Sequence, residues 1–417
     1  MTTIDLSDFE GFWAKPLDYR HAAFDELRAR PGLPFFEEPE FGSLPRGRGY
    51  YAVTKMDDVL FASRNPGTFI SGKGNATPVD MPAEFLDQSM ISMDDPRHAR
   101  LRRIVSRGFT NKKIRSLHDN VAQVAKEIVD EVIDRGEVDA VEDIAAKLPL
   151  RIICDMMGVP EANQQFVFDQ TNKMMGVQDP EYVPEGEDAF EALFKAVQEL
   201  TNLLHELAAK RAENPTDDMI SQLMTAEVNG ESLTPNELAQ FFILLTGAGT
   251  ETTRNAIAWG IHLLTKHPEQ REAWLADLDG VTPTAVEEIV RWTTPVIAQR
   301  RTIAEDAEPV ELSGQLLVPG DKVMMYYWAA NRDPKYFTDP AGFDVRRDPN
   351  PQIGYGGPGP HFCLGAHLAR LEIGVMFREL LTRIPDLRST AEPARLTSPM
   401  INGIKRLPVA FTPGGAR

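Results

Sequence analysis

The chain has 417 residues, a formal net charge of −18 and two cysteines. This length permits one large domain or two smaller ones, and either can enclose a cofactor. The strong negative charge argues against general binding to nucleic acid or to an anionic membrane.

No stretch is apolar for long enough to span a membrane, and the N-terminus has neither the basic nor the apolar region of a signal peptide. Two thiols, Cys154 and Cys363, make no disulfide framework and fit a reducing compartment. We therefore expect a cytoplasmic protein, and we expect it to be a monomer.

The first quarter of the chain predicts short elements and then an irregular segment. A helix is expected near Tyr19–Arg30, a strand at 50–54, and a second helix from Asp57. Glycines and prolines break any period between residues 70 and 90. Such a long loop in a compact enzyme is often a binding loop, and a plain surface loop is the alternative.

A basic segment follows in this acidic chain. Eight lysines and arginines, and no acid, lie between Arg97 and Arg115. His98 and Arg102 are four residues apart and share one helical face. The remaining cations form either a solvated helix face or a docking surface for an acidic partner: Arg100, Arg103, Arg107, Lys112 and Lys113.

Residues 148–160 predict a buried helix that ends at Gly158, with Cys154 as a core thiol. Residues 163–192 carry aromatic and methionine side chains at helical spacing around a loop from Gly176 to Pro184. Core packing is the commoner explanation of such a pattern.

A long helix over residues 236–260 is apolar on nearly all sides, so it should be central and buried. Gly247 and Gly249 each weaken it by about 1 kcal/mol relative to alanine. Glu251 and Thr252 then place polar groups inside it. Local conflicts of this kind concentrate at functional sites.

The next segments predict scaffold elements. A capped helix is expected over 284–292, in which Glu288 and Arg291 share a face. Small strands are expected at 310–312 and 322–327, and a strand and turn at 400–405.

The segment from Tyr355 to Gly365 contains three glycines and two prolines before Cys363, and one more glycine after it, so it must be a shaped loop. A helical pattern follows directly, and the helix N-terminus should lower the pKa of the thiol. A nucleophilic cysteine would need a base, for which His361 or His367 could be proposed. A single thiolate cannot hold a structural zinc ion, but haem iron needs only one strong protein ligand.

The loop resembles the haem-binding loop of the cytochrome P450 family, with Gly359, His361, Cys363 and Gly365 at the matching positions. The central helix is similar to the family's oxygen-binding pattern at residues 248–252. One position departs from the family, because Gly356 stands where phenylalanine is usual and the aromatic residue is Tyr355.

The resemblance covers roughly residues 17–411. It implies a mainly α fold with a small β-rich part and a long central helix over the haem. We expect one domain over residues 1–417, with an N-terminal extension of about 17 residues. Segments 148–160, 251–256, 282–292 and 403–409 look like the mycobacterial branch that hydroxylates methyl-branched lipids and sterol side chains.

The resemblance implies heme b with Cys363 as the axial ligand of the iron. Glu251 and Thr252 would be the catalytic proton relay, and Glu288, Arg291 and Arg347 a structural ion-pair group. The loop at 70–90, residues 296–299 and the turn at 400–405 would line the substrate pocket, under a lid at 163–192. The other implied cofactor-binding residues are His98, Arg102, Arg301, His361, Ala248, Gly249, Tyr355, Gly357 and Gly365.

The implied activity is hydroxylation of an unactivated C–H bond, at the terminal position of a methyl-branched fatty acid, an isoprenoid or a sterol side chain. Electrons would come from NAD(P)H through a separate ferredoxin and its reductase, with the ferredoxin on the basic segment. Three alternatives stay open: a compact terpene or other secondary metabolite as substrate, a peroxide-using enzyme, and a non-catalytic haem sensor or binding protein.

Overall fold

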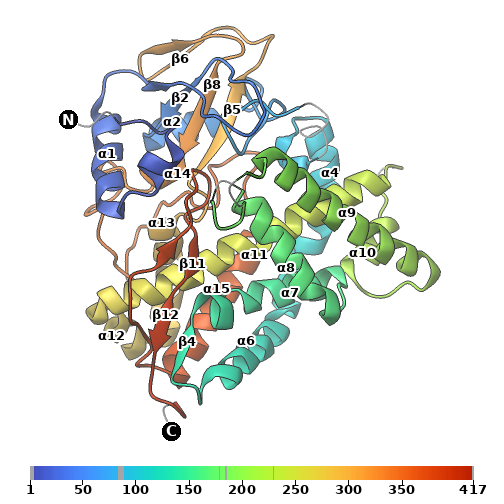
Figure 1. The fold of residues 1–417 in the computed structure, drawn as a ribbon, viewed down its shortest axis with the longest axis vertical. Coiled ribbons are helices and arrows are strands. Elements are labelled where there is room, and N and C mark those ends of the chain that lie inside the picture. The colour runs from blue at the N-terminus through green and yellow to red at the C-terminus, as the bar shows by residue number, and fades with distance from the viewer. Residues whose placement is uncertain (1–3, 83–88, 178, 184–185, 229, 416–417) are drawn as a thin grey trace.

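Helices form most of the computed structural model, which describes residues 4–82, 89–177, 179–183, 186–228 and 230–415. Helix α11 crosses the middle of the molecule, and the other long helices surround it (Figure 1). The α-helices are α1 (Leu17–Ala29), α2 (Met56–Arg64), α4 (Arg97–Val105), α5 (Asn111–Ser116), α6 (His118–Val132), α7 (Lys147–Met157), α8 (Glu161–Met175), α9 (Ala189–Glu213), α10 (Met219–Met224), α11 (Pro235–Lys266), α12 (Pro268–Ala276), α13 (Leu278–Thr293), α14 (Tyr327–Ala330) and α15 (Ala366–Arg383).

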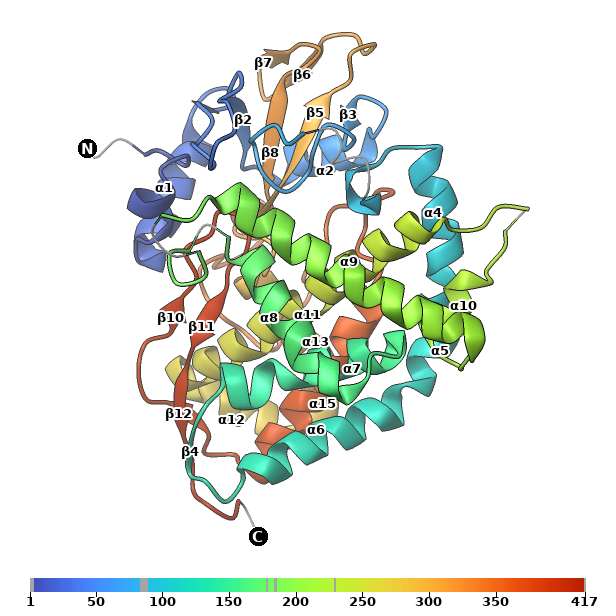
Figure 2. The same cartoon turned by 45° about the vertical axis from the view of Figure 1, so that its right-hand side comes forward.

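The strands are short and gather in a β-rich part at one end of the molecule and beside the C-terminal segment (Figures 1 and 2). The largest sheet has the order β1-β2-β8-β5-β3, in which only β2 and β8 are parallel. The strands are β1 (Phe35–Phe36), β2 (Tyr50–Val53), β3 (Phe69–Ile70), β4 (Glu137–Asp139), β5 (Ala298–Ile303), β6 (Val310–Leu312), β7 (Gln315–Leu317), β8 (Lys322–Tyr326), β9 (Arg388–Ser389), β10 (Ala394–Arg395), β11 (Ile404–Arg406) and β12 (Pro408–Ala410).

Helix α11 begins at a capping box, in which Thr234 and Glu237 satisfy each other's backbone N–H groups. The helix packs against α7, α8, α9, α13 and α15. Its apolar side chains are therefore covered on almost every side, as the sequence predicted.

Most predicted elements are confirmed, and two helix starts are wrong. Helix α13 begins at Leu278, where the Asp277 side chain caps Gly280 N–H, and not at Thr284. Helix α15 begins at Ala366, so Leu364 belongs to the loop although it fits the helical spacing. In α13 the recognised apolar pattern begins well after the first helical residue, whereas before α15 it begins in the loop. The apolar pattern alone therefore did not locate either helix start.

The first residues of the described chain pack against the largest sheet. Leu6, Phe12 and Trp13 are buried, and the Trp13 ring stacks on Tyr326 of β8 at a centroid distance of 6.3 Å. No helix of the described residues has both the length and the apolar character needed to cross a bilayer.

Helix α15 carries a buried carboxyl group, Glu372, which faces Thr253 of α11. Burial raises the pKa of Glu372 to about 8, although the hydrogen bond from Thr253 lowers it in part. The Oε1 atom has no hydrogen-bond partner in the described chain. The folded protein therefore retains a proton on Glu372 at pH values where the unfolded chain has lost it.

We expect Glu372→Gln to stabilise the protein at neutral pH. Between the ordinary value of 4.5 and about 8, the folded state binds the extra proton, so the free energy of unfolding falls as pH rises. The variant removes this penalty of roughly 2–3 kcal/mol at pH 7. Denaturant unfolding of both proteins at pH 5 and pH 7 checks this. An equal difference at the two pH values would contradict the assignment.

Candidate active site

The loop before α15 is held in place by its own backbone and by α2. Cys363 N–H donates to Tyr355 O at 3.0 Å, and Phe362 N–H donates to Gly359 O at 3.1 Å. A Cβ atom on Gly359 would lie 2.3 Å from the backbone oxygen of Ser63 at the end of α2. The glycine is therefore needed because the loop lies directly against that helix.

Gly356 has φ +90°, a conformation that side-chain-bearing residues rarely adopt. A phenylalanine at this position would therefore be strained, and the aromatic residue of this loop is Tyr355. The Tyr355 ring lies under the Arg370 guanidinium, whose carbon is 4.2 Å from the ring centroid. Arg370 in turn pairs with Glu287 of α13.

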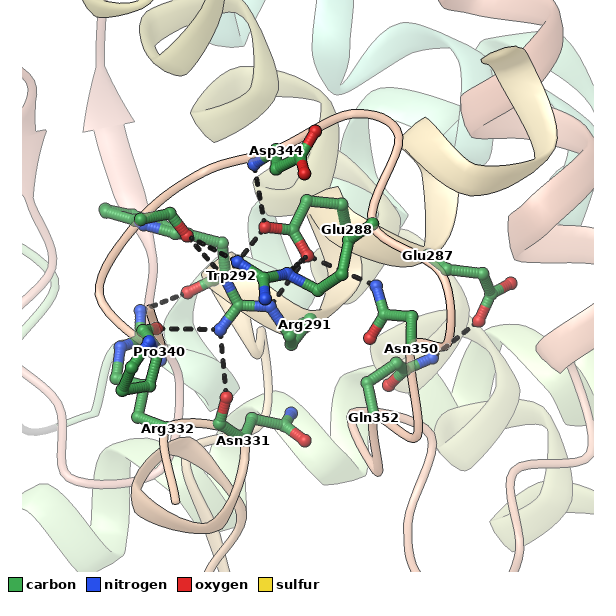
Figure 3. Close-up of polar contacts among 12 residues, drawn as sticks. Glu287, Glu288, Arg291, Trp292, Asn331, Arg332, Pro340, Asp344, Asn350 and Gln352 are labelled. Carbon is green, nitrogen blue, oxygen red and sulfur yellow. Dashed lines mark hydrogen bonds and ion pairs between the residues drawn. The ribbon is translucent and has the colours of Figure 1, made fainter. Parts of the chain in front are cut away.

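A buried ion-pair group lies between α13 and the segment that leads to the loop (Figure 3). Arg291 binds both oxygens of Glu288, at 2.7 and 2.8 Å, and the two side chains are fully buried. Arg347 Nε donates to Glu288 Oε2 at 3.0 Å. The predicted three-residue group is therefore present, and it also binds backbone atoms of residues 331–344.

This group is connected to the cysteine loop through Asn331. Arg291 Nη1 donates to the Asn331 carbonyl oxygen at 3.0 Å, and Asn331 Oδ1 accepts from Ile353 N–H at 2.8 Å. Ile353 lies two residues before Tyr355. Helix α13 thus fixes the path of the chain just before the cysteine.

The thiol of Cys363 is accessible to solvent, yet it lies deep enough for desolvation to matter. Burial raises its pKa, and this outweighs the Gly365 N–H group, Arg102 and Arg370, which lower it. The expected lowering by the helix N-terminus is therefore wrong as a net effect. A metal ion that binds the sulfur would remove the proton regardless.

A group of basic side chains lies beside the loop. The rings of His98 (α4) and His361 have centroids 4.2 Å apart, and His361 Nε2 is 3.1 Å from Ser71 Oγ. Desolvation, together with Arg301, His98 and Arg102, lowers the pKa of His361 to about 3. His98, Arg102, Arg301 and His361 are thus brought together from three separate segments.

This group carries more cations than acids, because among its four members only His98 has a carboxylate partner in the described chain, Asp95 at 3.4 Å. His98 Nε2 is buried without a hydrogen-bond partner, and neither Arg102 nor Arg301 forms an ion pair within the described chain. Arg301 is almost fully buried, and desolvation lowers its pKa. A buried arginine without a carboxylate is costly, so the arrangement fits an anionic group from outside the chain.

One turn in the buried middle of α11 carries an exposed residue. Ala248 is exposed, although Thr246, Gly247 and Thr250 are buried. Thr252 Oγ1 donates to Ala248 O at 2.8 Å. A Cβ atom on Gly249 would lie 2.9 Å from Ile153 Cδ1, so this glycine permits the close approach of α7.

Glu251 is fully buried and paired with Arg254, one turn further along α11. Arg254 Nη1 also donates to Asn172 Oδ1 of α8 at 2.6 Å. Burial raises the pKa of Glu251, and Arg254 offsets part of this increase. Arg254 was not among the predicted site residues, although its spacing of three residues from the acid was the available signal.

A cavity of about 550 Å³ lies against this turn of α11. Ala248, Glu251 and Thr252 line one part of it, and apolar side chains from α8, α9 and the 398–401 segment line much of the rest. All the predicted wall segments contribute residues: the 70–90 loop, residues 296–299 and the 400–405 turn. Residues 83–88 of that loop lie outside the described residues, as do 178, 184 and 185 of the expected lid.

The 74–82 part of the loop is anchored by ion pairs that the sequence did not reveal. Asp80 accepts from Arg300 of β5 at 2.8 Å and from Lys322 of β8 at 2.5 Å. Arg300 also donates to the carbonyl oxygens of Pro78 and Val79. Val79 lines the cavity, so the sheet sets the position of this wall.

The cytochrome P450 sequence profile matches residues 38–384. The chain belongs to the cytochrome P450 family. This membership confirms the fold class and the predicted enzyme class, a haem-thiolate monooxygenase. It also means that the cofactor is a haem bound by a cysteine thiolate.

Among curated relatives, this P450 is 46% identical over 414 residues to a methyl-branched lipid omega-hydroxylase of Mycobacterium tuberculosis, covering 98% of this chain and 95% of the relative. It is 39% identical to a steroid C26-monooxygenase of Mycolicibacterium smegmatis, over 88% and 85% of the two chains. A Mycobacterium marinum cytochrome P450 in complex with pseudoionone superposes with a TM-score of 0.91, at 39% identity and 98% coverage of both chains. The predicted branch is therefore confirmed.

The residues of this P450 fit a haem on chemical grounds. The accessible Cys363 thiol would supply the thiolate that such a haem needs, and a Cβ on Gly365 would meet nothing within 4 Å. His98 Nε2, which has no hydrogen-bond partner, and the guanidinium groups of Arg102 and Arg301, which have no carboxylate partner in the described chain, suit the two propionates. The nucleophile alternative loses its basis, because no hydrogen bond joins His361 or His367 to the thiol within the described chain.

Proposed function

We propose that this P450 hydroxylates a terminal carbon of a methyl-branched lipid, an isoprenoid or a sterol side chain. The observation that carries the proposal is the apolar cavity that meets the Ala248–Thr252 turn of α11. Its volume lies in the range of cavities that enclose small-molecule ligands. Relatives named for methyl-branched lipids and for steroids support the same substrate class.

A spectral titration of the ferric protein tests the proposal. The ligands are a methyl-branched fatty ester, an isoprenoid alcohol, cholestenone, a straight-chain congener and a compact terpene. We expect a low-to-high spin shift with the branched and sterol ligands, followed by terminal hydroxylation in product analysis. A shift with the compact terpene alone would refute the proposed substrate class.

We propose Cys363 as the haem ligand, and His98, Arg102 and Arg301 as donors to the propionates. The haem supplies the oxidising chemistry when it is bound. The Thr252 hydroxyl would then form a hydrogen bond at the place where the reaction occurs. The Glu251 carboxyl group, once its ion pair with Arg254 is broken, would exchange protons with that hydroxyl. The cavity orients the substrate and excludes water from the reacting carbon.

We expect Thr252→Ala to uncouple turnover from product formation. NADPH consumption should continue, but product per NADPH should fall about tenfold or more, because a positioned proton donor is lost. Hydrogen peroxide and product measured together check this. Thr201→Ala is the control, because Thr201 also lines the cavity but its hydroxyl donates to Val197 O within α9. Unchanged coupling in Thr252→Ala would remove the assigned role.

We propose that a ferredoxin, reduced from NAD(P)H by its reductase, docks on the basic surface formed by α4, the turn at 106–109 and α5. Arg103, Arg107, Lys112 and Lys113 are exposed there. Arg100 is less available, because it pairs with Glu237 and donates to Ser232 O. The two unpaired thiols are consistent with a cytoplasmic protein, and we propose a monomer.

We expect Lys112→Glu with Lys113→Glu to slow ferredoxin-driven turnover about tenfold at low salt, since surface charges mainly change the association rate. The difference should shrink as ionic strength rises. Peroxide-driven turnover should stay unchanged. The remote pair Lys15→Glu with Lys266→Glu, before α1 and at the C-terminal end of α11, makes the same charge change and should have little effect. Equal slowing by both pairs would contradict this docking surface.

A further inference from the structure

Three amide side chains line the substrate cavity without a partner of their own. Gln198 and Asn202 come from α9, and Gln240 comes from α11, which packs against α9 (Figure 2). None of the three side chains forms a hydrogen bond to another described residue, whereas Asn75, which also lines the cavity, bonds Ile91 O and Ser92. Their donors and acceptors are therefore available to a ligand.

The described lining of the cavity contains no lysine, arginine or histidine. Its one charged residue is Glu251, which is already paired with Arg254. Arg97 and Arg100, which lie near the start of α11, pair with Glu237 instead of lining the cavity. The described lining thus offers amides, hydroxyl groups and apolar surface to the ligand, and its one ionisable side chain is an acid.

This composition distinguishes between the possible polar ends of a lipid. A carboxylate that enters an apolar cavity loses its hydration, and without a cation nothing replaces it. A ketone, ester or alcohol oxygen costs less to desolvate, and amide N–H groups can satisfy it. The distance between the amides and the exposed residue of α11 also limits the substrate. Gln240 precedes Ala248 by eight residues, or about 12 Å along a straight helix.

We propose that Gln198, Asn202 and Gln240 bind the uncharged oxygen function of the substrate, and that this P450 selects ketones, esters or alcohols over the free carboxylic acid of the same chain. The inference rests on the proposed function and narrows its substrate class. The oxygen and the hydroxylated carbon should be separated by about ten bonds or more, judged from the reach of an extended chain.

The test compares one methyl-branched chain in three forms: the free acid, the methyl ester and the alcohol. Dissociation constants are measured by spectral titration and by calorimetry of the holoenzyme at pH 8, where the acid is ionised. We expect the ester and the alcohol to bind at least tenfold more tightly than the acid. The acid should gain affinity at lower pH, as its own carboxyl group becomes protonated.

Variants separate recognition by the amides from general hydrophobicity. Gln240→Leu should weaken binding of the alcohol by about threefold to tenfold, as expected for one lost hydrogen bond. Gln240→Arg should reverse the preference, because it supplies the missing cation, and should tighten binding of the acid at least tenfold. His205→Leu is the matched control, because His205 is exposed on α9 and does not line the cavity.

The outcomes distinguish this inference from the proposed function. If the acid and the ester bind equally and Gln240→Arg changes neither, the inference fails while the substrate class stands. If no form of the branched chain binds but a compact terpene does, the proposed function fails first. If Asn202→Lys reverses the preference but Gln240→Arg does not, the amide recognition stands, with Asn202 as its main contact.

Discussion

Cys363→Ala should abolish thiolate ligation and reduce substrate turnover below detection. The long-wavelength Soret absorption of the reduced carbon monoxide complex should disappear, because this signal requires a thiolate ligand. The protein should still fold, since Cys363 is a loop residue and its backbone hydrogen bond to Tyr355 does not involve the sulfur atom. Absorption spectra of the reduced complex, with a parallel unfolding curve, measure both effects.

Cys154→Ala is the matched control for this substitution. Cys154 lies in the core of α7, and burial raises the pKa of its thiol to about 12. We expect it to lose about 1 kcal/mol of stability and to leave the absorption spectrum unchanged. Retention of the long-wavelength band by Cys363→Ala would overturn the assignment of the ligand.

Glu288→Ala should lower the free energy of unfolding by about 3–5 kcal/mol, because it leaves Arg291 and Arg347 as buried charges without a counter-ion. That is a large part of the stability of an ordinary domain. The loop before Cys363 should also lose its anchor at Asn331. Denaturant unfolding and the yield of holoenzyme measure the two consequences.

The adjacent residue provides the control. Glu287 pairs with Arg370, but both side chains are about a quarter to a third exposed. Glu287→Ala should therefore cost only about 1 kcal/mol or less. A similar loss for Glu287→Ala and Glu288→Ala would show that burial of the charge is not the cause.

The spacing of residues in the chain was informative wherever the partners lie close in sequence. The pair Glu288–Arg291 is one helical turn apart, and the structure joins it as expected. His98 and Arg102 likewise lie on one face of α4. Such pairs follow from helix geometry alone, so no tertiary information was needed.

Contacts between segments that are far apart in the chain could not be predicted from residue spacing. Asp80 is held by Arg300 and Lys322, more than 200 residues further along the chain. Arg301 shares a site with His98 only because both side chains lie near His361 of the cysteine loop. The prediction that the pKa of the Cys363 thiol is lowered was likewise wrong. Desolvation raises this pKa, and it depends on all the groups that surround the sulfur.

The sequence by itself determined the family, the cysteine loop and the central helix with its glycines, acid and threonine. These features are local, because each depends on residue types at fixed short spacings. Only the tertiary structure decided which side chains line the cavity, that no cation is among those described, and that Gln198, Asn202 and Gln240 lie free within it. The physical reason is that a cavity is bounded by segments far apart in the chain, and their packing fixes which side chains face it.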